Sequence, residues 1–280
     1  MAILRVHARN KPLEEEVDLS LLARRTAGFS GAALANLLNE AAIYAARANC
    51  STIGPEHLSA AHDRITIGPL KKNAQASARQ QRITAAHEAG HALVASLLPD
   101  YDQVVKVSIT PRTNPRTNPG GLTVLAPSQD RIDAGLYTRQ FLECQMMVGL
   151  AGRVAEEVLF GADEVTTRAS KDIEHVTDTA RMMVTEFGMG TRLGQMSVLE
   201  GVRVSQETQS LIDSEIDTLV KGVYEKTTRL IQDNRTCLTL LAALLEEQET
   251  VTAEELETLL RENHINIAAL RDPAFDGFGP

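Results

Sequence analysis

The stretch His87-Glu88-Ala89-Gly90-His91 places two histidines four residues apart, with a glutamate directly after the first. On a helix, residues four apart lie on one face, one turn apart, so both imidazoles can point at the same spot. This H-E-x-x-H pattern is typical of a zinc site, in which the glutamate takes a proton from a water at the metal. The alternative is a pair of ordinary surface histidines. The sequence around the motif favours the metal, and we predict a Zn²⁺ site.

The sequence on either side predicts a helix followed by two strands. The helix runs from about Thr84 to Leu98, where Pro99 ends it. Residues 104–109 and 122–125 are rich in branched apolar side chains and predict strands. The segment between them, 111–121, contains the tetrapeptide PRTN twice, and we expect a mobile loop there. The buried face of the helix is predicted from its small and apolar residues: Ala86, Gly90, Leu93, Val94 and Leu97.

Helical periodicity continues through most of the remaining chain. We predict helices over 136–160 and 170–187, the second capped by Ser170. Residues 205–246 predict one long helix, or two that are separated near Asp233-Asn234. Residues 252–255 form a capping box that opens a last short helix. Glycines inside the first of these helices, Gly149 and Gly152, indicate close packing against a neighbour.

The N-terminal part predicts a small all-helical module. Residues 1–20 are polar and are expected to form a loop. Ser30 is suited to cap a helix, and Gly54-Pro55 is suited to start another. Residues 68–80 have no apolar periodicity, which indicates a boundary between domains. The whole chain is therefore predicted to be mainly α, with one small β-element.

Composition narrows the possible functions. The chain has 280 residues and a formal net charge of −9, which argues against a general nucleic-acid binder. Its three cysteines form no close pair, so a reducing compartment is expected. The sequence holds no apolar run long enough to cross a membrane. It also lacks the G-x-x-x-x-G-K-[ST] motif that cradles nucleotide phosphates.

A catalytic zinc needs a third protein ligand, and the sequence offers several. The motif does not continue as H-E-x-x-H-x-x-G-x-x-H. His7, His57 and His62 fall in the N-terminal module, and His264 lies near the tail. The helix after residue 170 remains, and spacing does not choose among its polar side chains, Asp172, Glu174, His175 and Asp178.

Four motifs, in this order, resemble those of the FtsH-type proteases. They are HEAGHAL, GLAGRVAEEVLFG (149–161), TTRASKDI (166–173) and MVTEFGMGTRLG (183–194). Members of that family are membrane-anchored AAA ATPases with a C-terminal zinc peptidase domain. HARNKPL (7–13) and GFSGAALANLLNEAA (28–42) resemble the helical lid that ends the AAA module. The resemblance covers about residues 4–262.

The resemblance implies a role for each site residue. In the family, the third ligand is an aspartate at the start of the helix after a TT-GAS segment, which corresponds to Asp172. His87, His91 and Asp172 would then bind zinc, and Glu88 would act as general base. Glu156 or Glu157 is a candidate to support a ligand histidine. The substrate is expected to bind as an extended strand near residues 121–125.

Three positions depart from the family pattern. Arg168 stands where the family usually has glycine, and Lys171 where it usually has asparagine. Ala86 replaces a residue that is often aromatic. The two added positive charges could weaken the metal site, tune its water or point to solvent.

The resemblance also implies an organisation for the parent protein. We expect a helical AAA lid over 1–70, a zinc metallopeptidase domain over 71–265 and a flexible tail over 266–280. ATP and Mg²⁺ would bind only in the full-length parent, a hexamer anchored in a membrane by an N-terminal segment absent here. This part would lie in the cytoplasm, or in an organelle stroma or matrix.

Three functions are compatible with these features. The first is a zinc endopeptidase that degrades unfolded or membrane-extracted polypeptides delivered by an ATP-driven unfoldase. The second is a proteolytically silent relative that serves as a structural or chaperone subunit. The third is a standalone metallopeptidase with an accessory helical domain. The motifs favour the first, because neither a ligand nor Glu88 is lost.

Overall fold

A computed structural model describes residues 1–26, 28–66, 77–99, 101–110, 120–127, 135–198, 201, 204–263 and 265. The PRTN repeat, most of the 68–80 segment, His264 and the tail lie outside these residues. The chain divides into two compact units, one mainly from residues 1–75 and the other mainly from residues 76–109, 121–125 and 136–280. No helix among the described residues is long and apolar enough to cross a membrane.

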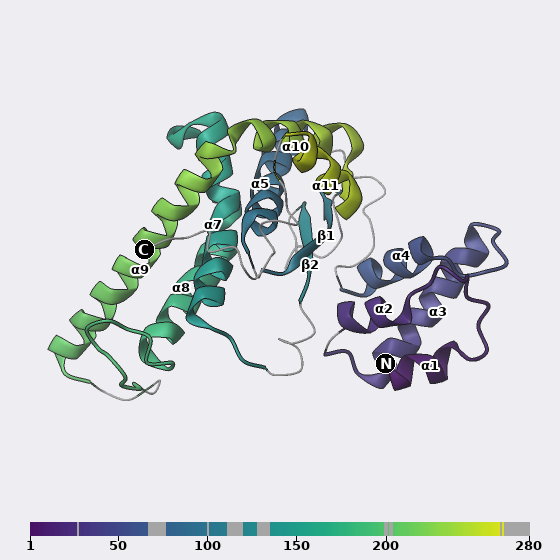
Figure 1. Ribbon diagram of the computed structural model, residues 1–280, viewed down its shortest axis with the longest axis horizontal. Helices are drawn as coiled ribbons and strands as arrows, with labels where there is room; N and C mark the ends of the chain where they lie inside the picture. The colour runs from purple at the N-terminus through teal and green to yellow at the C-terminus, as the bar shows by residue number, and fades with distance from the viewer. Residues whose placement is uncertain are drawn as a thin grey trace. The chain divides into compact units, whose positions relative to one another are not determined.

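The N-terminal unit is all-helical, as predicted (Figure 1). Ser30 caps its longest helix by accepting a hydrogen bond from the Ala33 backbone amide. The prediction of a loop over residues 1–20 is wrong for Ala2–Ala8, where Leu4 and Ala8 lie one turn apart on a helix and are buried. It is confirmed for residues 9–18, which lie between the first two helices. The helices that the structure describes in this unit are α1 (Ala2–Ala8), α2 (Leu19–Arg25), α3 (Gly31–Arg47) and α4 (Pro55–Thr66).

The second unit is mainly helical, with one small sheet, as the sequence predicts. The long helix breaks at Asn234, and the capping box at Thr252 and Glu255 is present. Its elements are α5 (Ala78–Leu97), β1 (Gln103–Ser108), β2 (Leu122–Ala126), α7 (Arg139–Phe160), the short turns η1 (Ala162–Glu164) and η2 (Thr167–Ala169), α8 (Ser170–Thr185), α9 (Gln206–Asp233), α10 (Arg235–Gln248), β3 (Thr250–Thr252) and α11 (Ala253–Glu262).

The sheet has the strand order β2-β1-β3. β3 is a short strand that the sequence analysis missed, because three residues show no periodicity. It runs antiparallel to β1, with Val107 opposite Val251. β1 packs against α5, so the sheet lies beside the helix that carries the H-E-x-x-H motif (Figure 1).

Helix α5 lies in the centre of the second unit. It contacts α7 and α10 as well as β1, and almost every residue from Thr84 to Leu97 is buried. The predicted buried face was therefore too narrow. A helix that neighbours cover on all sides carries apolar or small residues around its whole circumference.

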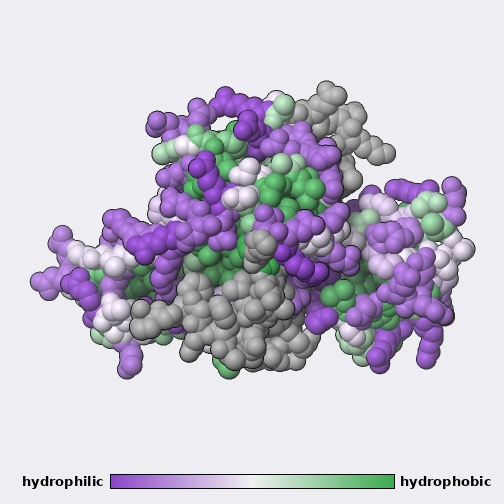
Figure 2. Space-filling view, turned by 45° about the horizontal axis from the view of Figure 1, so that its top comes forward, coloured by the Kyte–Doolittle hydropathy of each residue, from purple (hydrophilic) through white to green (hydrophobic). Residues whose placement is uncertain are grey.

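Hydrophilic side chains cover much of the visible surface, and hydrophobic ones gather in patches between them (Figure 2).

Three helix starts differ from their predictions. α7 begins at Arg139, three residues after the predicted start, because Thr138 caps it. α5 begins at Ala78, where Ser77 caps it, six residues before the predicted start. Ser170 is not an N-cap, because the turn η2 runs directly into α8 and leaves Ser170 with helical backbone angles. A capping residue needs extended angles to turn its side chain back onto the helix.

Candidate metal centre

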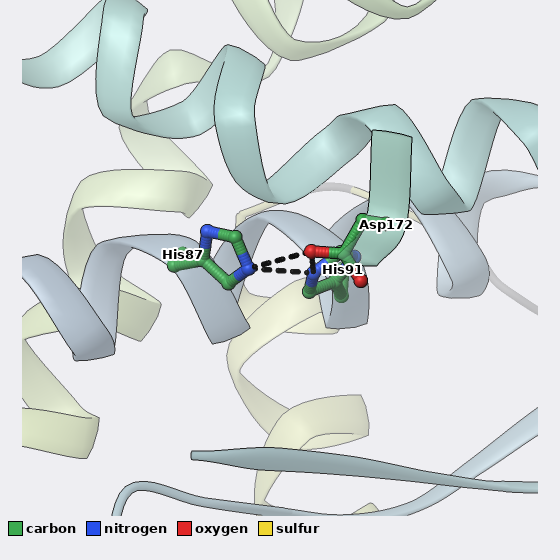
Figure 3. Close-up of side chains that lie close together, drawn as sticks. All are labelled: His87, His91 and Asp172. Carbon is green, nitrogen blue, oxygen red and sulfur yellow. Dashed lines mark hydrogen bonds and ion pairs between the residues drawn. The ribbon is translucent and has the colours of Figure 1, made fainter. Parts of the chain in front are cut away.

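His87 and His91 project from one face of α5, as their spacing predicts. Their Nε2 atoms lie 3.0 Å apart, and both side chains point at the same spot (Figure 3). The motif is deep in the protein, with His87 3% exposed. This burial argues against ordinary surface histidines.

Asp172 reaches the same spot from the first turn of α8. Its Oδ2 atom lies 3.2 Å from His87 Nε2 and 3.8 Å from His91 Nε2 (Figure 3). Among the described residues, these three are the only group of histidine, cysteine and acidic side chains placed to share an ion.

The spacing of the three donor atoms suits zinc. Tetrahedral zinc with ligands at about 2.0–2.1 Å requires donor atoms about 3.3–3.4 Å apart. The observed separations of 3.0, 3.2 and 3.8 Å scatter around that value. Two imidazoles and one carboxylate are also ligands that zinc takes in catalytic sites.

Each histidine is oriented by a bond from its other ring nitrogen. His87 Nδ1 donates to Glu156 Oε1 at 2.8 Å, and His91 Nδ1 donates to the Val148 carbonyl at 2.7 Å. Glu156 is fully buried, and its Oε2 accepts from the backbone amide and the hydroxyl of Thr166, both at 2.8 Å. These bonds leave both Nε2 atoms directed at the metal position.

The surroundings shift the protonation of the site in the metal-free protein. Burial disfavours a charged His87, but the hydrogen bonds that its ring donates to Asp172 and Glu156 outweigh it and raise the pKa of His87 to about 9. Burial and the neighbouring His87 lower the pKa of His91. Burial opposes ionisation of Asp172, yet the bond from His87 and the charge of His91 hold its pKa below the usual value.

Glycines in α5 and α7 leave room for the site. A Cβ atom on Gly90 would lie 2.5 Å from the Ala151 carbonyl oxygen, so Gly90 permits the close approach of α7. A Cβ atom on Gly152 would lie 2.6 Å from the Nε2 atoms of both histidines. A side chain at position 152 would therefore occupy the space beside the metal-facing nitrogens.

Glu88 sits beside the metal-facing atoms, in contact with two other elements. The hydroxyl of Thr123, in β2, donates to Oε2 at 3.0 Å. Arg168 Nη2, from η2, lies 3.3 Å from Oε1. Arg168 thus points toward Glu88 and not to solvent, which was one of the outcomes considered for this departure from the family pattern.

The other predicted candidates lie apart from this cluster. His175 is exposed and bonds to Gln145. Glu157 accepts a hydrogen bond from the Tyr224 hydroxyl, so Glu156 alone of the two glutamates contacts a ligand histidine. Three further polar residues are exposed, namely Glu174, Asp178 and Lys171, and Ala86 is buried. The N-terminal unit contains the histidines His7, His57 and His62.

Sequence reasoning missed two threonines that hold the site. Thr123 contacts Glu88, and Thr166 holds Glu156. Thr166 lay within a motif already singled out, while Thr123 carried no local signal because its partner lies 35 residues earlier.

Comparison with known proteins identifies matches over both units. Residues 74–259 match the model of peptidase family M41, and residues 16–60 match the AAA+ lid domain. The chain is 48% identical to the ATP-dependent zinc metalloprotease FtsH 3 of Synechocystis, over 96% of this chain and 45% of that protein. It is 46% identical to the chloroplastic FTSH 1 proteins of rice and of Arabidopsis thaliana, over 92% of this chain and 39% and 37% of those proteins. The chain spans less than half the length of these relatives.

Proposed function

Because this chain belongs to peptidase family M41, we propose that it is the zinc endopeptidase part of a longer ATP-dependent protease. The observation that carries this proposal is the convergence of His87, His91 and Asp172 at zinc-ligand spacing. Glu88 follows His87 on α5 and acts electrostatically on both histidines. The match to AAA+ lid domains and the ATP-dependent relatives support the larger assignment.

In this proposal His87, His91 and Asp172 hold the metal, and Glu88 moves the proton. Zinc, when bound, makes a water more acidic and polarises the peptide carbonyl. Glu88 accepts the proton of the attacking water and delivers it to the amine that leaves when the peptide bond breaks. Glu156 keeps the His87 ring in place, and Thr123 holds the Glu88 carboxylate.

The substrate proposed here is an extended, unfolded polypeptide that lies along β2. Among the described strands, β2 pairs with β1 alone, and Thr123 links it directly to Glu88. Backbone pairing along the edge of a strand binds a peptide largely independently of its side chains. This mode of binding suits an enzyme that degrades many sequences.

The N-terminal unit is proposed to be the lid of an AAA+ module, with the peptidase domain following it near residue 71. No nucleotide-cradling motif occurs in the 280 residues, so ATP and Mg²⁺ would bind to another part of the parent protein. That part would unfold substrates and feed them to the peptidase within a hexamer. The relatives named above come from a bacterium and from chloroplasts.

Zinc analysis combined with casein cleavage tests this function. Glu88→Gln is expected to keep zinc and lose cleavage by at least about a thousandfold, because it removes the proton acceptor but no ligand. Asp172→Ala should weaken zinc binding, whereas the matched control His175→Ala should leave zinc and cleavage unchanged. Zinc that survives Asp172→Ala but not His175→Ala would overturn the ligand set.

A proteolytically silent subunit is the second candidate. The contact between Arg168 and Glu88 favours it, because the guanidinium lies against one of the two carboxylate oxygens with which Glu88 would contact a water. Wild-type protein that holds zinc but never cleaves, even when joined to an active ATPase ring, would support this candidate.

A further inference from the structure

Arg168 contacts Glu88 at the metal centre, and the mechanism proposed above assigns it no role. Its Nη2 atom is 3.3 Å from Glu88 Oε1, and the two side chains are only 11% and 7% exposed. Burial from water strengthens the attraction between opposite charges and protects it from screening by salt. This pair therefore differs from the surface ion pairs of the protein, such as Arg79 with Glu164, whose side chains are 77% and 57% exposed.

The Glu88 carboxylate is held at both of its oxygens by groups from different elements. Thr123 of β2 donates to Oε2, and Arg168 of η2 lies against Oε1. Gly121 leaves the necessary room, because a Cβ atom there would collide with Glu88 and lie 2.8 Å from Arg168 Nη2. Two anchors on different oxygens restrict both the position and the direction of the carboxylate.

We propose that Arg168 is a positioning residue for Glu88, acting with Thr123 to keep the ionised carboxylate where it takes the proton from water. The inference rests on the proposed function, because it requires Glu88 to be the base. A group held in its reactive geometry speeds the chemical step without changing how tightly the substrate binds.

Kinetics of casein cleavage by the zinc-loaded chain test the role of the guanidinium. Arg168→Ala should lower kcat about tenfold and change KM by less than about twofold, as expected for loss of positioning alone. Arg168→Lys should recover part of the lost kcat because it keeps the cation, whereas the neutral Arg168→Gln should not. The control Lys171→Ala removes an exposed cation three residues away and should leave both constants unchanged.

Two kinetic results would overturn the proposal. A higher kcat for Arg168→Ala would mean that the guanidinium restrains the base. Equal behaviour of Arg168→Lys and Arg168→Gln would mean that its charge has no role.

A double-mutant cycle tests the contact without any cleavage assay. The zinc-loaded wild type, Glu88→Gln, Arg168→Ala and the double variant would be unfolded in urea. The expected coupling is at least about fivefold in the unfolding equilibrium constant, as for contacting charged residues. Additive effects would overturn the proposal even if the chain cleaves nothing. Failure of the function itself would instead appear as wild type and Glu88→Gln being equally inactive while the coupling persists.

Discussion

Single residues at the metal centre are each held by a partner that the motif does not contain. Glu156 and the Val148 carbonyl orient the histidines, and Thr166 in turn holds Glu156. A ligand fixed in this way loses less freedom when it binds a metal, and its free nitrogen already faces the ion. The H-E-x-x-H motif therefore supplies the two histidine donors, and residues 57 and 69 positions away orient them.

Zinc binding should release a proton from His87 at neutral pH. Its pKa of about 9 lies above pH 7, so the metal-free site carries a proton that zinc must displace. Zinc affinity should rise about tenfold per pH unit from pH 7 until pH approaches 9. Calorimetry at pH 7 in two buffers of different ionisation enthalpy measures the released proton. No proton release would contradict a charged His87.

The raised pKa of His87 also makes the stability of the metal-free protein depend on pH. A raised pKa in the folded state stabilises the fold below the ordinary histidine value of 6.5, and this contribution is lost as pH rises through about 9. The variant Glu156→Gln replaces the charged acceptor of the His87 bond with a neutral one. It should therefore reduce both the proton release on zinc binding and the pH dependence of stability.

At the scale of elements, the crossing of α5 and α7 brings the site together. Gly90 on α5 allows the two helices to approach closely, and Gly152 on α7 leaves room beside the histidines. α8 then delivers Asp172 from its first turn, where the helix dipole favours an anion. Glycines in helix interiors cost stability, so their presence here has a physical reason in packing and in space for the metal.

The variant Gly152→Ala should block the metal and spare the fold. Its methyl group would meet the Nε2 atoms of both ligand histidines, so zinc affinity should fall by at least about a hundredfold. The matched control is Gly222→Ala inside α9, whose methyl group would meet nothing within 4 Å. Zinc titration with circular dichroism distinguishes the two variants. Equal zinc affinity in both would contradict this account.

At the scale of the whole molecule, the two units have separate hydrophobic cores. The N-terminal core contains Leu37 and Ala61, and the larger core surrounds α5. All three proposed zinc ligands belong to the second unit. Metal binding should therefore stabilise that unit alone.

Removing zinc should lower the melting temperature of the second unit only. A ligand present at a thousand times its Kd stabilises by about 4 kcal/mol, which corresponds to on the order of 10 °C for a unit of this size. Calorimetry with and without a chelator should show one transition that moves and one that does not. Asp172→Ala should abolish the shift, and movement of both transitions would refute independent units.

The sequence by itself determined the helical class, most helix boundaries, the two longer strands and the helix break at Asn234. These features follow from local periodicity, capping residues and breakers, which act over a few residues. It also determined that His87 and His91 share a face, because the helical repeat alone fixes that. The errors arose where local rules were incomplete, as at Leu4, buried by distant residues, and at Ser170, preceded by a tight turn.

Only the tertiary structure decided which distant groups join the motif. From spacing alone, Asp172 and His175 were equal candidates, and the packing of α8 brings the first to the histidines and leaves the second exposed. The choice of Glu156 over Glu157 and the contact of Arg168 with Glu88 were decided in the same way. Contacts between residues 69 to 85 positions apart depend on how helices cross, and no local pattern encodes that crossing.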